Sequence, residues 1–213
     1  MRNSDLKTSI KKTWLRSFAT WLLAPVMHFL TRIDIQGLHN LPVDGAAVLA
    51  CNHISMYDAF ILQLCLPRAI FFMSKVENFK NPIIRVLMEQ LGSFPVERGA
   101  TDRGALHHAL QVLAAGEILG MFPEGTRTHG NGLTEAKTGT AHLAMRANTP
   151  IIPVVLHGTE KILKNPCKKA EVTLKVLPAI LAMQQEKAIE LTARLMKLIA
   201  AELPESQRGI YVD

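Results

Sequence analysis

An apolar run that ends abruptly in a polar turn occurs twice in this sequence and most constrains how the chain can fold. Residues 46–51, Ala-Ala-Val-Leu-Ala-Cys, lead directly into the polar stretch 52–58, Asn-His-Ile-Ser-Met-Tyr-Asp. Residues 117–122 likewise lead into Pro-Glu-Gly-Thr-Arg at 123–127. Short, nearly continuous apolar runs are typical of strands that are buried on both faces, as in parallel sheets. The pattern favours an α/β fold with polar groups where two central strands end.

Strands and helices alternate along most of the chain. We expect strands at 33–35, 46–51, 70–73, 94–96, 117–122, 151–156 and 172–176, and helices at 55–64, 83–91, 105–115, 138–147 and 184–203. In the last helix, the residues expected on one apolar face are Ile189, Leu195, Met196 and Ile199. This order predicts an α/β domain over residues 33–213, with a central mixed, largely parallel sheet covered by helices. Ligand sites in such folds gather in loops beyond strand ends, where both polar turns fall.

The first 32 residues differ in character from this domain. Residues 2–16 carry five basic side chains against the single acid Asp5, and residues 17–30 are mainly apolar. Pro25, His28 and the short length argue against a membrane-spanning helix. The helical spacing of the apolar residues Trp14, Phe18, Trp21 and Leu22 predicts a membrane-interfacial helical segment over residues 1–32. A terminal helix packed on the core with a solvated basic face is the alternative.

Composition limits the class of partner. The net charge is +6 in 213 residues, which favours an anionic partner. Aromatic residues make up only 6% and are not interleaved with basic ones, so a lipid surface is favoured over nucleic acid. The three cysteines form no Cys-x-x-Cys pair, and we expect Cys51 and Cys65 to be reduced, buried packing groups. The histidines show no metal-ligand spacing, so no metal site is expected.

His53 and Asp58 are the candidate acid–base pair. On one continuous helix, residues five apart lie about 140° apart around the axis, so their side chains would diverge. We therefore expect His53 before the helix and Asp58 in its first turn, where the carboxylate can orient the imidazole as a general base. A structural alternative stays open, because Ser55-x-x-Asp58 also matches a helix capping box. No Gly-x-Ser-x-Gly sequence supplies a nucleophile, which favours direct action on an acceptor hydroxyl.

Three cations follow predicted strands and suggest an anion site. Arg127 lies two residues after Gly125, where the backbone can approach a ligand, and a guanidinium matches a phosphate in bidentate fashion. Arg98 and Lys75 follow two other strands, and Glu124 could pair with one of the cations. Each cation alone could equally be a solvated surface charge.

Five sequence blocks occur in a fixed order across residues 33–160. They are Gly37–Gly45 leading into Asn-His-x-Ser-x-x-Asp at 52–58, Lys-x-Glu at 75–77, Pro-Val-Glu-Arg at 95–98, Phe-Pro-Glu-Gly-Thr-Arg at 122–127, and Pro-Ile-Ile-Pro-Val at 150–154. Together these blocks resemble the lysophosphatidate (1-acyl-glycerol-3-phosphate) acyltransferases and the wider glycerolipid acyltransferase superfamily. The resemblance is specific because it depends on the order of all the blocks and not on one of them.

The resemblance implies acyl transfer from acyl-CoA or acyl-carrier protein to the free hydroxyl of lysophosphatidate, giving phosphatidate without a cofactor. It implies His53 as general base with Asp58 as its partner. The residues implied in binding the acceptor are Lys75, Arg98, Glu124, Gly125, Thr126 and Arg127. It also implies a membrane-associated enzyme, expected on the cytoplasmic face, with membrane lipids as partners. The alternatives are a different glycerolipid or lyso-aminolipid acceptor, an acyl-thioester hydrolase with the same dyad, and a non-catalytic lipid-binding protein.

Overall fold

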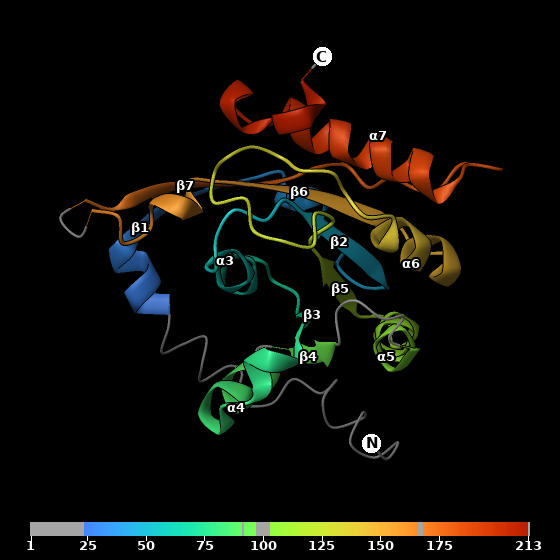
Figure 1. Cartoon of the computed structure of the whole chain (residues 1–213), viewed down its shortest axis with the longest axis horizontal. Helices are drawn as coiled ribbons and strands as arrows, with labels where there is room; N and C mark the ends of the chain where they lie inside the picture. The colour runs from blue at the N-terminus through green and yellow to red at the C-terminus, as the bar shows by residue number, and fades with distance from the viewer. Residues whose placement is uncertain (1–23, 91, 97–102, 166–167, 213) are drawn as a thin grey trace.

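A computed structural model describes residues 24–90, 92–96, 103–165 and 168–212 of the chain (Figure 1). The strands are β1 Thr31–Gln36, β2 Ala47–Cys51, β3 Ile70–Lys75, β4 Ser93–Val96, β5 Ile118–Met121, β6 Ile151–His157 and β7 Ala170–Val176. The helices are α3 Asp58–Cys65, α4 Pro82–Gln90, α5 Arg103–Ala114, α6 Gly139–Ala147 and α7 Ala188–Ala201. Short 3-10 turns include η1 Leu38–Asn40, η2 Val76–Phe79, η3 Thr159–Lys161, η4 Glu205–Gln207 and η5 Gly209–Tyr211. Residues 24–30 are also helical.

The seven strands form one sheet in the order β1-β7-β6-β2-β5-β3-β4. Every neighbouring pair is parallel except β6 and β7, which run antiparallel. The predicted mixed, largely parallel sheet is therefore confirmed. Strand β2 lies near the centre, and all five of its residues are fully buried, as its uninterrupted apolar sequence requires.

Helices cover both faces of the sheet, so the molecule has three layers (Figure 1). Alternate residues of β2 point to opposite faces, as they must in a strand. Val48 and Ala50 join the apolar cluster formed with α5, α6 and α7. Leu49 and Cys51 join the cluster that contains α3 and Met27 of the N-terminal helix. The two clusters hold the polar turn after β2 at a fixed place on the sheet edge.

Several predicted boundaries differ from the structure. Helix α3 begins at Asp58, not near residue 55, because the carboxylate of Asp58 already accepts the backbone N–H groups of Ile54 and Ser55. Helix α7 begins at Ala188, not near residue 184. Of the residues predicted on one apolar face of this helix, Leu195, Met196 and Ile199 are fully buried, whereas Ile189 in the first turn is 67% exposed.

The predicted membrane-interfacial segment lies largely outside the described residues, which begin at residue 24. Within them, Val26 and Phe29 of the helix 24–30 expose their side chains, while Met27 packs into the core. None of the helices in the described part of the chain is long and apolar enough to cross a bilayer.

Candidate functional site

The two polar turns meet because β2 and β5 are parallel neighbours. Ala50 pairs with Met121, so the residues that follow each strand emerge at the same edge of the sheet. The backbone N–H of His53 donates to Oε1 of Glu124 at 2.9 Å, and the N–H of Thr128 donates to the carbonyl of His53 at 2.9 Å. The turns after β2 and β5 are thus joined from both sides into one site.

His53 and Asp58 are in direct contact. Nδ1 of His53 lies 2.8 Å from Oδ2 of Asp58, and the carboxylate is fully buried while the imidazole is 18% exposed. His53 precedes α3 and Asp58 is its first residue, which is the placement that the five-residue spacing predicts. An ionised carboxylate can only accept hydrogen bonds, so Nδ1 carries the proton and Nε2 presents a lone pair. This arrangement makes Nε2 the basic atom of the pair.

Four donors surround the carboxylate of Asp58. Besides the imidazole, the backbone N–H groups of Ile54 and Ser55 donate to Oδ2 at 2.7 and 2.8 Å. The hydroxyl of Thr159 donates to Oδ1 at 2.5 Å, and Thr159 is fully buried. A buried carboxylate without partners would be costly, and these four bonds stabilise its charged form. Sequence analysis missed Thr159, which lies 101 residues away along the chain.

The predicted capping box is only half formed. Tyr57 occupies the N-cap position of α3, and the hydroxyl of Ser55 accepts the N–H of Tyr57 at 3.3 Å, not that of Asp58. The other half is present, because the carboxylate of Asp58 accepts the N–H of Ser55. The carboxylate of Asp58 therefore does both: it accepts a backbone N–H just before α3, as in a capping box, and it orients the ring of His53.

An aromatic stack fixes the plane of the imidazole. The ring of Phe122 stacks on His53 with centroids 3.9 Å apart and planes at 16°. The ring of Phe72 also stacks on Phe122, with centroids 5.6 Å apart. Gly120 makes room for this stack, because a methyl group there would lie 2.3 Å from the ring of Phe72. The glycine in the apolar run before Phe122 is the sequence signal for this close approach.

Glu124 is a positioning residue in the structure. Its Oε1 accepts the N–H of His53, and its Oε2 accepts the N–H and hydroxyl of Thr134 at 3.0 and 3.3 Å. Burial raises the pKa of Glu124, although these hydrogen bonds and, to a smaller extent, the electrostatic interaction with His53 oppose the shift. The prediction that Glu124 could pair with a cation finds no support among the described side chains, since Glu124 faces backbone and hydroxyl donors.

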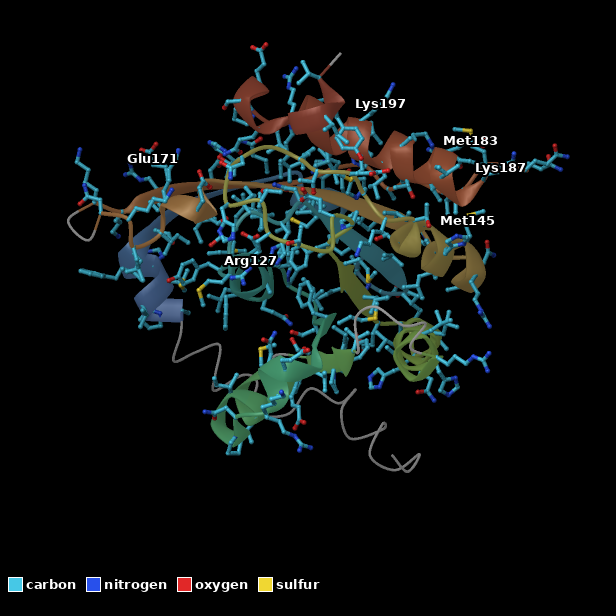
Figure 2. The ribbon with its side chains drawn as sticks, viewed as in Figure 1. Arg127, Met145, Glu171, Met183, Lys187 and Lys197 are labelled. Carbon is cyan, nitrogen blue, oxygen red and sulfur yellow. The ribbon has the colours of Figure 1, made fainter. Side chains whose placement is uncertain are left out.

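Two cations flank the turn at 123–127. Arg127, labelled in Figure 2, is exposed, and it takes part in none of the ion pairs found among the described residues. Lys137, which sequence analysis did not single out, donates its backbone N–H to the carbonyl of Pro123 at 2.9 Å. A methyl group added at Gly125 would lie 3.4 Å from Nζ of Lys137, so this side chain runs across the turn. Arg98 lies outside the described residues, and Lys75 is the last residue of β3.

The thiol of Cys51, which ends β2 just before the dyad, is not available as a nucleophile. Cys51 is fully buried, and burial together with the charges of Asp58 and Glu124 raises the pKa of its thiol. The backbone N–H groups of His53, Ile54 and Ser55 are all bonded to carboxylates, so they cannot serve as donors to an oxyanion. The described site therefore offers a base and cations, without a covalent relay.

The largest hollow described here lies apart from the dyad, on the side of β1 and β7. A cavity of about 810 Å³ is lined by residues of the helix 24–30, β1, α3 and β7, and it does not include His53 or Asp58. Cys65, expected to be buried, is half-buried on the wall of this cavity, and burial raises the pKa of its thiol to about 11. Among the residues described, no three His, Cys, Asp or Glu side chains lie close enough to hold a metal ion.

Comparisons with known proteins place the chain in a family. A family model described as acyltransferase matches residues 32–157, which is more than half of the chain. A 1-acyl-sn-glycerol-3-phosphate acyltransferase of Bacillus subtilis (strain 168) is 32% identical over 127 residues, covering 59% of this chain and 63% of that protein. The chloroplastic 1-acyl-sn-glycerol-3-phosphate acyltransferase LPAT1 of Arabidopsis thaliana is 35% identical over 135 residues, covering 62% of this chain and 38% of that protein. The chain thus matches less than two thirds of the length of these relatives.

The fold also resembles a solved structure. The crystal structure of the 1-acyl-sn-glycerophosphate acyltransferase PlsC from Thermotoga maritima superposes with a TM-score of 0.74. The match covers 96% of this chain and 84% of that one, at 20% sequence identity. At this identity the likeness establishes a shared fold.

Proposed function

Because this chain belongs to the acyltransferase family, we propose that it is an O-acyltransferase that acylates lysophosphatidate. In this proposal, the acyl group comes from acyl-CoA or acyl-carrier protein and the product is phosphatidate. The names of the relatives from Bacillus subtilis and Arabidopsis thaliana support this acceptor. The single observation that carries the chemistry is the 2.8 Å contact between the buried carboxylate of Asp58 and the partly exposed ring of His53.

The proposed reaction needs one base and no cofactor. Nε2 of His53 takes the proton of the acceptor hydroxyl while the hydroxyl oxygen attacks the thioester carbonyl. Collapse of the tetrahedral intermediate breaks the carbon–sulfur bond, and the imidazolium returns the proton to the leaving thiolate. Asp58 stabilises the imidazolium in between, and the stack on Phe122 keeps the ring oriented.

The phosphate of the acceptor would bind at the turn after β5. Arg127 and Lys137 place two cations beside this turn, and the predicted ligands Gly125 and Thr126 lie within it. Charge-assisted hydrogen bonds from such groups match a phosphate monoester. Arg98 and Lys75 remain candidates from the sequence pattern for the same role.

A panel of substrates tests this function directly. The purified full chain is incubated in vesicles with lysophosphatidate, glycerol-3-phosphate, a lyso-aminolipid and other lysophospholipids, each with acyl-CoA or acyl-carrier protein. We expect phosphatidate by mass spectrometry and stoichiometric release of thiol, and no product from a folded His53→Ala variant. Thiol release at full rate without any acceptor would instead establish a thioesterase. Full turnover by His53→Ala would refute the proposed base.

The proposal also includes association with a membrane through residues 1–32. The described part of this segment supports it, because Val26 and Phe29 of the helical residues 24–30 are exposed apolar side chains. A lipid acceptor could then keep its acyl chain in the bilayer while its phosphate reaches the cations. Sedimentation with vesicles before and after removal of residues 1–23 measures this association.

A further inference from the structure

Residues 204–212, the C-terminal segment, play no part in the proposed chemistry, yet they lie against a loop that does. This loop, residues 122–138, joins β5 to α6 and runs beside the C-terminal turns η4 and η5 (Figure 1). Within it, Thr134 bonds to Glu124, which accepts the N–H of the dyad histidine, and Lys137 is one of the two cations proposed to bind phosphate. The position of the loop therefore bears directly on the proposed site.

The backbone of Leu133 in this loop is bonded to the C-terminal segment through both of its polar groups. Its N–H donates to the carbonyl of Gln207 at 3.0 Å, and its carbonyl accepts the N–H of Ile210 at 3.3 Å. The two backbones come so close that Gly209, with a φ of +58°, has no room for a methyl group against the carbonyl oxygen of Leu133. The C-terminal segment is therefore shaped to fit this loop.

Tyr211 holds the loop where it reaches the proposed phosphate cation. Its hydroxyl accepts the N–H of Ala136 at 3.3 Å, and the N–H of the next residue, Lys137, donates instead to the turn after β5. Burial raises the pKa of Tyr211; the bond from Ala136 opposes this shift and the charge of Glu124 adds to it, so the hydroxyl stays protonated. The backbone that presents Lys137 is thus held between the C-terminal segment and the turn.

Gln207 connects the same segment to the back of the dyad. Its side chain is buried, and its Oε1 lies 2.8 Å from Nδ1 of His157, the last residue of β6. Two residues later, Thr159 bonds to the dyad carboxylate. Gln207 also lines, with Asn52 and Ile54, a hollow of only about 10 Å³, which is space for at most one water molecule. The C-terminal segment is therefore packed against both parts of the site.

We propose that the C-terminal segment positions the acceptor-phosphate site, with Tyr211 acting as a positioning residue for Lys137. A lysine side chain is long and flexible, so fixing the backbone that carries it lowers the cost of placing its charge on a phosphate. This role rests on the proposed function, because it assigns Lys137 to the phosphate of the acceptor. The alternative is a segment that only covers the apolar core, since the ring of Tyr211 also packs against that core.

A single hydroxyl distinguishes the two roles in the full chain. Tyr211→Phe keeps the ring in the core and removes only the bond to Ala136. We expect KM for a short-chain lysophosphatidate to rise roughly three- to tenfold with little change in kcat, as for the loss of one neutral hydrogen bond. KM for a monoacylglycerol, which has no phosphate, should not change. A purely structural role would alter both acceptors alike or neither, and either result overturns the inference.

The matched control lies in the same segment. Ile210→Gln changes a side chain that is 65% exposed and leaves the backbone bond to Leu133 in place. It should turn over both acceptors like the unaltered chain. Thermal unfolding of each variant verifies that it is folded, and a loss of affinity in Ile210→Gln equal to that in Tyr211→Phe contradicts the assignment to the hydroxyl.

A double-mutant cycle tests whether Tyr211 acts through Lys137. When Lys137→Gln has already removed the cation, Tyr211→Phe should have little further effect on kcat/KM for lysophosphatidate. Independent losses that multiply in the double variant would show that the hydroxyl does not position this lysine.

Hydrogen exchange separates this inference from the proposed function, because it needs no turnover. In the ligand-free chain, amide exchange in residues 128–137 should be faster in Tyr211→Phe, and faster still in Gly209→Ala, than in Ile210→Gln or the unaltered chain. Equal exchange in all four proteins overturns the positioning role whether or not the chain is active. Faster exchange in the first two variants, combined with no turnover of any acceptor by the unaltered chain, refutes the proposed function and leaves the hold on the loop established.

Discussion

The hydroxyl of Thr159 donates to Oδ1 of Asp58 at 2.5 Å, so both oxygens of the dyad carboxylate are hydrogen-bonded. We predict that Thr159→Val lowers kcat about tenfold or more with little change in KM, because a hydrogen bond to a buried charge is lost from a group that orients the base. Thr159→Ser should retain most activity. Thr192→Val is the matched control, since its buried hydroxyl donates to the carbonyl of Ala188, away from the dyad. Equal kcat values for the Val and Ser variants would contradict this positioning role.

Replacing the dyad carboxylate should separate chemistry from folding. We predict that Asp58→Asn lowers kcat by about 10²–10⁴-fold, since the neutral amide cannot stabilise the imidazolium that forms during transfer. The amide oxygen can still accept the N–H groups of Ile54 and Ser55, so α3 should keep its start. Steady-state kinetics and thermal unfolding check the two parts of this prediction. A variant that is folded and fully active would show that the contact with His53 is only structural.

The cations beside the turn at 123–127 should discriminate between acceptors. We predict that Arg127→Gln and Lys137→Gln each reduce kcat/KM for lysophosphatidate about tenfold or more, through loss of a charge-assisted hydrogen bond to the phosphate. Turnover of a monoacylglycerol, which lacks the phosphate, should change much less. Arg146→Gln, in the last turn of α6, removes the same charge elsewhere and should have no effect. Equal losses on both acceptors would rule out phosphate binding by these side chains.

A buried histidine away from the dyad predicts a pH dependence of stability. His108 on α5 stacks on Phe94 at 4.1 Å, and its Nε2 has no hydrogen-bond partner in the described structure. Burial, with a smaller contribution from His107, lowers the pKa of His108 below 6.5. Its contribution to the free energy of unfolding is therefore present above about pH 6.5 and is lost as the pH falls through the lower, folded-state value.

Chemical unfolding between neutral and mildly acid pH tests this contribution. The free energy of unfolding should fall more steeply on acidification for the unaltered chain than for His108→Phe, which keeps the stack on Phe94 without a titrating group. His142→Gln, at an exposed position of α6, should behave like the unaltered chain. Parallel curves for His108→Phe and the unaltered chain would show that His108 does not titrate on unfolding.

Local patterns were sufficient to predict the fold class and the central contact of the site. The apolar run of β2 is buried on both faces, so its hydrophobicity alone identifies a central strand. His53 and Asp58 lie on the two sides of one strand-to-helix junction, so a five-residue spacing and helix geometry determine whether they can meet. The start of α3 was less predictable, because the carboxylate of Asp58 competes with helix formation for the backbone N–H groups before it.

The sequence by itself determined which segments are buried, where charged turns follow them, and which histidine faces which carboxylate, since each depends on neighbours along the chain. Only the tertiary structure decided that Thr159 bonds to Asp58 and that Lys137 crosses the turn at Gly125. The physical reason is that parallel pairing and the single antiparallel pair β6–β7 bring together residues that are more than a hundred positions apart or in different turns. No periodicity or spacing in the sequence encodes that proximity.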